Sequence, residues 1–128
     1  MIDDMGSFRI DVEIENPAAP GPRQLVSSVL VDTGAELSCF PAEALESLGI
    51  ARRQQRRFRQ ADGSVLLRWT GAAFVFAAGA STTDEVIFGE SGDLTLLGSR
   101  SLEGLNLRID PVAKRLSDAG PMPLAVAL

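Results

Sequence analysis

The residues best suited to do chemistry in this sequence lie in the stretch VLVDTGAELSCFP, residues 29–41. An apolar run ends there at Asp32, which Thr33 and Gly34 follow directly. A carboxylate at the end of a buried strand is either part of an ordinary strand-to-loop exit or an acid held in place for proton transfer. Asp-Thr-Gly is too short a motif to choose between these interpretations, so the elements around it have to decide.

The composition restricts which catalytic chemistry is possible. The chain has no histidine and a single cysteine, Cys39. Ser-His-Asp and Cys-His sites, histidine-ligated zinc and thiolate zinc sites are therefore excluded, and we expect no metal and no cofactor. Carboxylates, Lys114 and permanently protonated arginines remain, so an enzyme of this composition should use Asp or Glu. Cys39, inside an apolar stretch, is interpreted as a small core residue.

Length and charge place the chain in a broad class. Its 128 residues suit one domain, with 45% hydrophobic and 23% charged residues typical of a globular protein. The net charge of -5 argues against a general nucleic-acid binder. The start MIDDMGSF lacks the apolar core of a secretory signal, and no apolar run approaches the roughly 20 residues that span a bilayer. We expect a cytoplasmic protein with no membrane partner.

Periodicity predicts the elements that position Asp32. Residues 7–16 alternate between apolar and polar side chains, which predicts a half-buried strand. The proline-rich residues 17–24 predict a hairpin connection, and residues 25–31 predict the returning strand. A short helix is expected over residues 41–48. The other expected elements are a strand–turn–strand unit at 56–69, strands at 72–79, 84–89 and 93–98, one or two helical turns at 99–106, and a final strand or hairpin at 107–116.

About seven strands with two short helices predict an all-β barrel or sandwich. Four segments then occur in a characteristic order along the chain, and with them the sequence resembles the single-domain retropepsin-like aspartic proteases over residues 8 to about 116. The four segments are LVDTGAE, FPAEALESLGI, QADGS and LLGSRSLEGLNLRID. The resemblance implies one domain, a closed β-barrel with one or two short helices and a β-hairpin flap, and an aspartic endopeptidase activity.

Hydrolysis of a peptide bond without metal or covalent intermediate needs a base to activate water and an acid to protonate the carbonyl oxygen. Two neighbouring aspartates can do both, because like charges so close cannot both ionise and therefore share one proton. This chain offers only one Asp-Thr-Gly. The mechanism therefore predicts a homodimer in which Asp32 of each subunit meets its partner at the twofold axis, with an extended peptide or protein as substrate.

Roles for the residues after Asp32 follow from residue type and from the resemblance. Gly34 permits a tight turn with close backbone approach, so that amide groups can bond the aspartates. By resemblance, the hydroxyl of Thr33 crosses the dimer interface to bond the partner's loop. Ala35 and Glu36 are expected, likewise by resemblance, to border the substrate groove.

Two further segments are assigned by the same resemblance. Asp62 and Gly63, at the tip of the expected hairpin, match the flap that closes over the peptide and excludes water. Leu96, Leu97 and Gly98 match a second family motif, in which a hydrophobic pair and a glycine pack behind the catalytic loop as support.

The sequence departs from the family pattern in three places. Glu36 stands where the family commonly has aspartate. Ser99 follows the glycine of the second motif where an arginine is common, and Arg100 comes next, so pairing of Arg100 with Glu36 is left open. The expected flap tip contains one glycine. The tail, residues 117–128, extends past the matched region, and its LAVAL end is a candidate intersubunit strand.

Other functions remain open at this point. One alternative is a catalytically silent domain that keeps the fold for dimerisation or peptide capture. Another is a phosphate- or RNA-binding β-domain that uses the arginine-rich stretch ARRQQRRFRQ, although a solvated strand face is the favoured interpretation of that stretch. Its five arginines are Arg52, Arg53, Arg56, Arg57 and Arg59.

Overall fold

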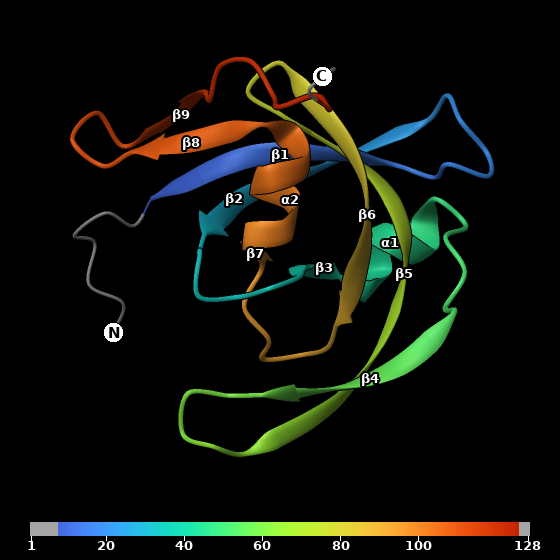
Figure 1. Cartoon of the computed structure of the whole chain (residues 1–128). Helices are drawn as coiled ribbons and strands as arrows, with labels where there is room; N and C mark the ends of the chain where they lie inside the picture. Colours follow the sequence, from blue (N-terminus) through green and yellow to red (C-terminus); the bar gives the residue numbers. More distant parts are fainter. Residues whose placement is uncertain (1–7, 126–128) are drawn as a thin grey trace.

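A computed structural model describes residues 8–125 and shows a mostly β chain, as the sequence predicts (Figure 1). The strands are β1 (Arg9–Glu15), β2 (Arg23–Val31), β3 (Ser38–Pro41), β4 (Gln54–Arg59), β5 (Val65–Ala77), β6 (Ala80–Gly89), β7 (Leu96–Leu97), β8 (Leu107–Asp110) and β9 (Arg115–Asp118). The helices are α1 (Ala42–Ser47) and α2 (Ser99–Leu105).

Seven strands form one sheet that closes on itself. Their order is β1-β2-β7-β3-β6-β5-β4, and an additional pairing joins β1 to β5. Six strands therefore form a ring, and β4 is attached to it through β5 alone. Most neighbours are antiparallel, but β2 pairs with β7 and β3 pairs with β6 in parallel. These parallel pairings bring the chain after β2, which contains Asp32, next to the chain after β7.

The inside of the ring is the hydrophobic core. The alternation of the first strand is confirmed, since Val12 and Ile14 are buried while Asp11 and Glu13 are exposed. Helices α1 and α2 close openings of the ring by burying Leu45 and Leu102, respectively. Fully buried residues from six strands meet there, namely Val12, Ile14, Val29, Phe40, Val75, Val86, Phe88 and Leu97.

Strand β5 differs from the sequence expectation. Residues 65–69 and 72–79 were expected as separate strands, but β5 is one strand of 13 residues. Its first half pairs with β4, and its second half pairs with β1. Gly71 inside β5 is not a turn residue: a Cβ there would lie 2.4 Å from the carbonyl oxygen of Ala51, so close backbone packing requires the glycine. The strand carries the hairpin out of the ring without a break.

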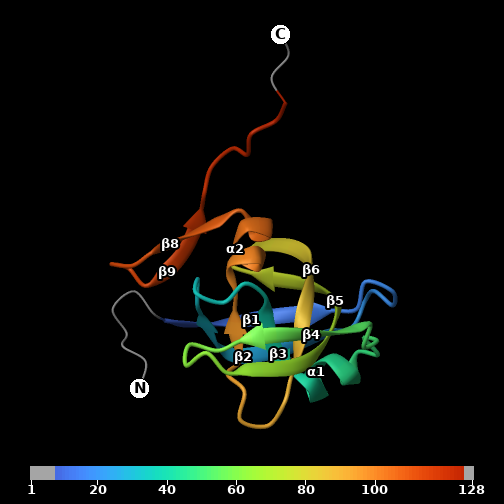
Figure 2. The same ribbon diagram turned by 60° about the horizontal axis from the view of Figure 1, so that its bottom comes forward.

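The C-terminal region forms a separate two-stranded sheet. Strands β8 and β9 pair with each other, which confirms the hairpin alternative for residues 107–116. Residues 119–125 have no helix or strand and lead away from the ring (Figure 2). Leu124 is 89% exposed. The rest of the candidate intersubunit strand, residues 126–128, lies outside the described residues.

Candidate active site

Asp32 lies directly after β2, on a turn that its own side chain helps to close. The amide of Gly34 donates a hydrogen bond to Oδ1 of Asp32 over 2.8 Å, and the amide of Ala35 donates to the Asp32 carbonyl over 3.3 Å. A Cβ on Gly34 would lie only 3.1 Å from Oδ1 of Asp32. Gly34 therefore leaves room for the carboxylate, which is half-buried, while the side chain of Thr33 is exposed.

The loop of residues 32–37 is held from behind by β7 and the start of α2. The amide of Asp32 donates to the carbonyl of Leu97 over 3.0 Å. The amides of Ser99 and Arg100 donate to the carbonyls of Ala35 (2.8 Å) and Glu36 (3.0 Å). Three backbone groups of the loop are thus bonded to a segment more than 60 residues away in sequence, which limits the motion of the loop.

A buried pair of serines, which the sequence interpretation missed, lies beneath this loop. The hydroxyl of Ser38 is 2.6 Å from that of Ser101 and accepts a hydrogen bond from the amide of Gly98 over 3.0 Å. Gly98 is tightly enclosed, because a Cβ there would lie 2.7 Å from the carbonyl carbon and oxygen of Leu37. The signal for this pair in the sequence is weak: Ser38 and Ser101 are small polar residues, each next to an apolar residue.

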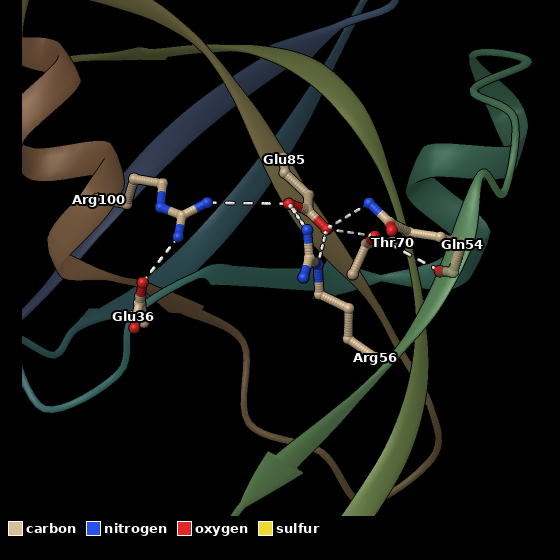
Figure 3. A network of polar contacts seen from close by, with 6 residues as sticks. All are labelled: Glu36, Gln54, Arg56, Thr70, Glu85 and Arg100. Atoms are coloured by element: carbon tan, nitrogen blue, oxygen red, sulfur yellow. Dashed lines mark hydrogen bonds and ion pairs between the residues drawn. The ribbon is translucent and has the colours of Figure 1, made fainter.

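A network of charges links the loop to the hairpin (Figure 3). Arg100 donates to Oε2 of Glu36 over 2.7 Å and lies 3.8 Å from Oε1 of Glu85, so the pairing left open by the sequence is present. Glu85, on β6, also accepts two hydrogen bonds from Arg56 of β4, over 2.5 and 3.1 Å. The hydroxyl of Thr70 donates to Glu85 over 2.6 Å. Arg56 and Thr70 hold the pKa of Glu85 below its ordinary value.

A second ion pair stabilises the opposite side of the site. Arg68 of β5 donates to both carboxylate oxygens of Asp93, over 2.7 and 2.8 Å. This hydrogen bonding holds the pKa of Asp93 below its ordinary value. Asp93 belongs to the loop between β6 and β7, so the pair joins that loop to the hairpin.

The two lowered pKa values predict how stability depends on pH. A carboxylate whose pKa is lower in the folded state stabilises that state fully above its unfolded pKa and loses the effect as pH falls through the folded pKa. We expect the Tm to be nearly constant down to about pH 5 and to fall below about pH 4. The double variant E85Q/D93N should melt at a lower temperature at pH 6 and show a smaller fall in acid, as measured by thermal melts followed by circular dichroism.

The matched control for this prediction is E103Q, which removes an exposed carboxylate on α2. It should reproduce the wild-type pH profile. The effect of Asp84 on stability has the opposite pH dependence, because burial raises its pKa. The double variant retains Asp84, so this effect is the same in both proteins. An acid-induced fall in the Tm of E85Q/D93N as large as that of the wild type would contradict the role of these two pairs.

The hairpin β4–β5 points to the same side of the molecule as the loop that contains Asp32 (Figures 1 and 2). At its tip, Gly63 has a φ of +88°, the left-handed conformation that glycine adopts without strain. Asp62 accepts hydrogen bonds from the amide and the hydroxyl of Ser64, over 2.8 and 2.6 Å, and these bonds lower its pKa. The carboxylate of Asp62 is therefore occupied in forming the turn.

A cavity of about 520 Å³ lies between the loop and the hairpin. Its apolar lining consists of Leu37, Phe58, Leu66, Ile87, Leu94 and Leu96. Of the residues expected from the sequence, Gly34, Ala35, Glu36 and Leu96 line this cavity. Asp32 and Thr33 precede the lining residues of the loop and are not themselves part of the lining, and neither are Asp62 and Gly63. Leu97 and Gly98 lie behind the loop. The hairpin residues Phe58 and Leu66 were not predicted, because only the strand register brings them over the loop.

The environment of Cys39 and the arginine-rich stretch is also defined. Cys39 is buried, and burial raises the pKa of its thiol to about 12, which agrees with its interpretation as a core residue.

Arg52 pairs with Glu46 over 2.5 Å and lies over the ring of Phe88. Together with the pairing of Arg56, this accounts for two of the five arginines as parts of the folded structure.

Within residues 8–125, no group of three or more His, Cys, Asp or Glu side chains is arranged to hold a metal ion. The helices of this described part are all too short or too polar to cross a membrane.

Neither a protein-family model nor a curated protein sequence matches the chain. The arrangement places a half-buried carboxylate on a rigid loop beside a cavity under a hairpin, which is suited to acid–base chemistry on an extended ligand.

Proposed function

We propose that this protein is a retropepsin-like aspartic endopeptidase that acts as a homodimer, with a closed β-barrel fold in each subunit. The observation that carries the proposal is the placement of Asp32. Its carboxylate accepts a hydrogen bond from the amide of Gly34, and its own amide donates a hydrogen bond to the carbonyl of Leu97 behind the loop. The cavity and the overlying hairpin provide room for a peptide next to this loop.

In the proposed reaction, the two Asp32 carboxylates of a dimer share one proton and hold one water molecule. The ionised carboxylate takes a proton from the water while the oxygen of the water attacks the carbonyl carbon of the peptide bond. The protonated member gives its proton to the carbonyl oxygen, which forms a neutral tetrahedral diol. Collapse of the diol breaks the C–N bond, and a proton passes to the leaving amine.

The surrounding residues support this reaction by positioning. The amide of Gly34 orients one oxygen of Asp32 through a hydrogen bond of 2.8 Å. The substrate lies extended between the loop and the hairpin, in the manner of an added strand. Closure of the hairpin excludes bulk water, which strengthens the electrostatic interactions at the reacting carbonyl. By resemblance, Thr33 bonds to the loop of the partner subunit and fixes the two aspartates relative to each other.

The dimer gives a prediction that can be tested without knowing the natural substrate. A monomer holds half of the site, so specific activity should rise with protein concentration and level off once the dimer is saturated. Activity assays across a dilution series, together with the mass measured by analytical ultracentrifugation, should give the same midpoint. A specific activity that stays constant under conditions where only monomer is present would contradict the shared site.

A further inference from the structure

The hairpin side of the cavity carries positive charge that the folded chain does not neutralise. Of the charged residues that line the cavity, Glu36 is paired with Arg100, and Arg68 is paired with Asp93. Arg57 and Arg59 also line it, and within residues 8–125 neither has a charged or hydrogen-bonding side-chain partner. Both are exposed. This charge at the edge of the cavity favours an anionic ligand that lies along β4.

The spacing of these arginines matches the geometry of a β-strand. Arg57 and Arg59 are two residues apart in β4, so their side chains project from the same face, about 6.6 Å apart along the strand. Phe58 between them projects from the opposite face, where it is half-buried and pairs in register with Leu66. The strand thus presents two cationic side chains on one face and an apolar side chain on the other.

Strand β4 also has an unpaired edge. It is the last strand of the sheet and pairs only with β5, so its other edge has no strand neighbour within the described residues. An extended peptide can add to such an edge through its main chain, with side chains that alternate in step with those of β4. Side chains two residues apart in the peptide then lie beside Arg57 and Arg59, and the one between them lies beside Phe58.

We propose that the free edge of β4 selects peptides with the pattern acidic–apolar–acidic, through Arg57 and Arg59 on the outer face of the strand and Phe58 on its cavity face. The cleavage of such peptides rests on the proposed function, whereas their binding does not. Carboxylates two residues apart pair with the two guanidinium groups, and the apolar side chain between them enters the apolar part of the cavity. Arg57 and Arg59 are specificity-determining residues and take no part in the chemical step.

The test compares peptides that differ only in charge. The wild-type dimer is incubated with a peptide that contains Glu-Leu-Glu next to a cleaved bond and with its Gln-Leu-Gln analogue, and kcat/KM is measured by mass spectrometry. We expect the acidic peptide to be preferred by about fivefold, the size of effect given by two exposed ion pairs. The preference should shrink at high salt, because exposed charges are screened.

Variants assign the preference to its source. R57Q/R59Q should cleave both peptides with similar kcat/KM, while R57E/R59E should favour a Lys-Leu-Lys peptide. The matched control is R108Q, which removes an exposed arginine on β8 outside the cavity lining and should keep the wild-type preference. An acidic preference that survives in R57Q/R59Q, or its absence in an active wild type, would overturn the assignment.

A binding measurement separates this inference from the proposed function. Fluorescence anisotropy with labelled Glu-Leu-Glu and Gln-Leu-Gln peptides is measured on D32N, which needs no turnover. Preferential binding of the acidic peptide that R57Q/R59Q abolishes supports the inference, even if the wild type cleaves nothing and the protease proposal fails. Equal binding of both peptides by D32N overturns the inference, whether or not the wild type is a protease.

Discussion

Replacing Asp32 by asparagine should abolish peptide hydrolysis while the fold and the dimer persist. Asparagine has nearly the same size, and its side-chain oxygen can still accept the amide of Gly34, which now bonds Oδ1 over 2.8 Å. The amide group cannot take a proton from water, so a D32N dimer has no general base. We expect kcat/KM to fall by at least about 10³-fold in a peptide-library assay read by mass spectrometry at several pH values.

Asp11 offers a matched control for this variant. Its Oδ1 also accepts a backbone amide, that of Ser28 over 3.1 Å, and it lies on the exposed face of β1 away from the loop. D11N therefore makes the same chemical change, and kcat/KM should stay within about twofold of the wild type. Robust cleavage by D32N would remove Asp32 from the mechanism. A wild type that binds peptides without cleaving them would instead identify a silent peptide-binding domain.

Replacing Gly98 by alanine should strongly destabilise the loop that holds Asp32. The φ of Gly98 is −90°, which any residue can adopt, so backbone strain is not the reason for glycine there. The added Cβ would lie 2.7 Å from the Leu37 carbonyl carbon and oxygen and 2.9 Å from the carbonyl oxygen of Ala35. These are backbone atoms of the loop that holds Asp32, and they cannot rotate away.

We expect G98A to lose about 3 kcal/mol or more of unfolding free energy, the upper range for overpacking a rigid site. Urea unfolding followed by tryptophan fluorescence measures the loss. Gly92 provides the control, since its φ is +90° and a Cβ there meets nothing within 4 Å. G92A tests backbone strain alone and should lose about 1 kcal/mol. A G98A protein as stable as the wild type would show that the loop does not pack against the start of α2.

The pairing of Arg100 with Glu36, which the sequence left open, is present in the structure. Arg100, in α2, donates a hydrogen bond to Oε2 of Glu36 over 2.7 Å. The two residues are 64 positions apart in the sequence, so their contact depends on how the loop and the helix pack against each other.

Local patterns in the sequence were sufficient to predict most of the elements. The alternation at residues 7–16, the prolines of the first hairpin and the glycine at the expected flap tip each act through the conformations of a few neighbouring residues. The helix over residues 41–48 and the helical turns after Gly98 were predicted for the same reason. The absence of histidine excluded Ser-His-Asp sites, Cys-His sites and histidine-ligated zinc without any structure, because those sites require that side chain.

The contacts that build the site could not be predicted in this way. Three hydrogen bonds join segments about 60 residues apart: Asp32 donates to Leu97, Arg100 donates to Glu36, and Ser38 and Ser101 bond to each other. Such contacts depend on strand order and register, and a shift of one residue reverses the face of every side chain in a strand. The register of β4 on β5 likewise places Phe58 opposite Leu66 and leaves Arg57 and Arg59 on the other face. The five arginines of the sequence run therefore differ in the fold, because the sheet gives neighbouring residues different environments. Arg52 and Arg56 form ion pairs, Arg53 is exposed, and Arg57 and Arg59 have no side-chain partner within residues 8–125.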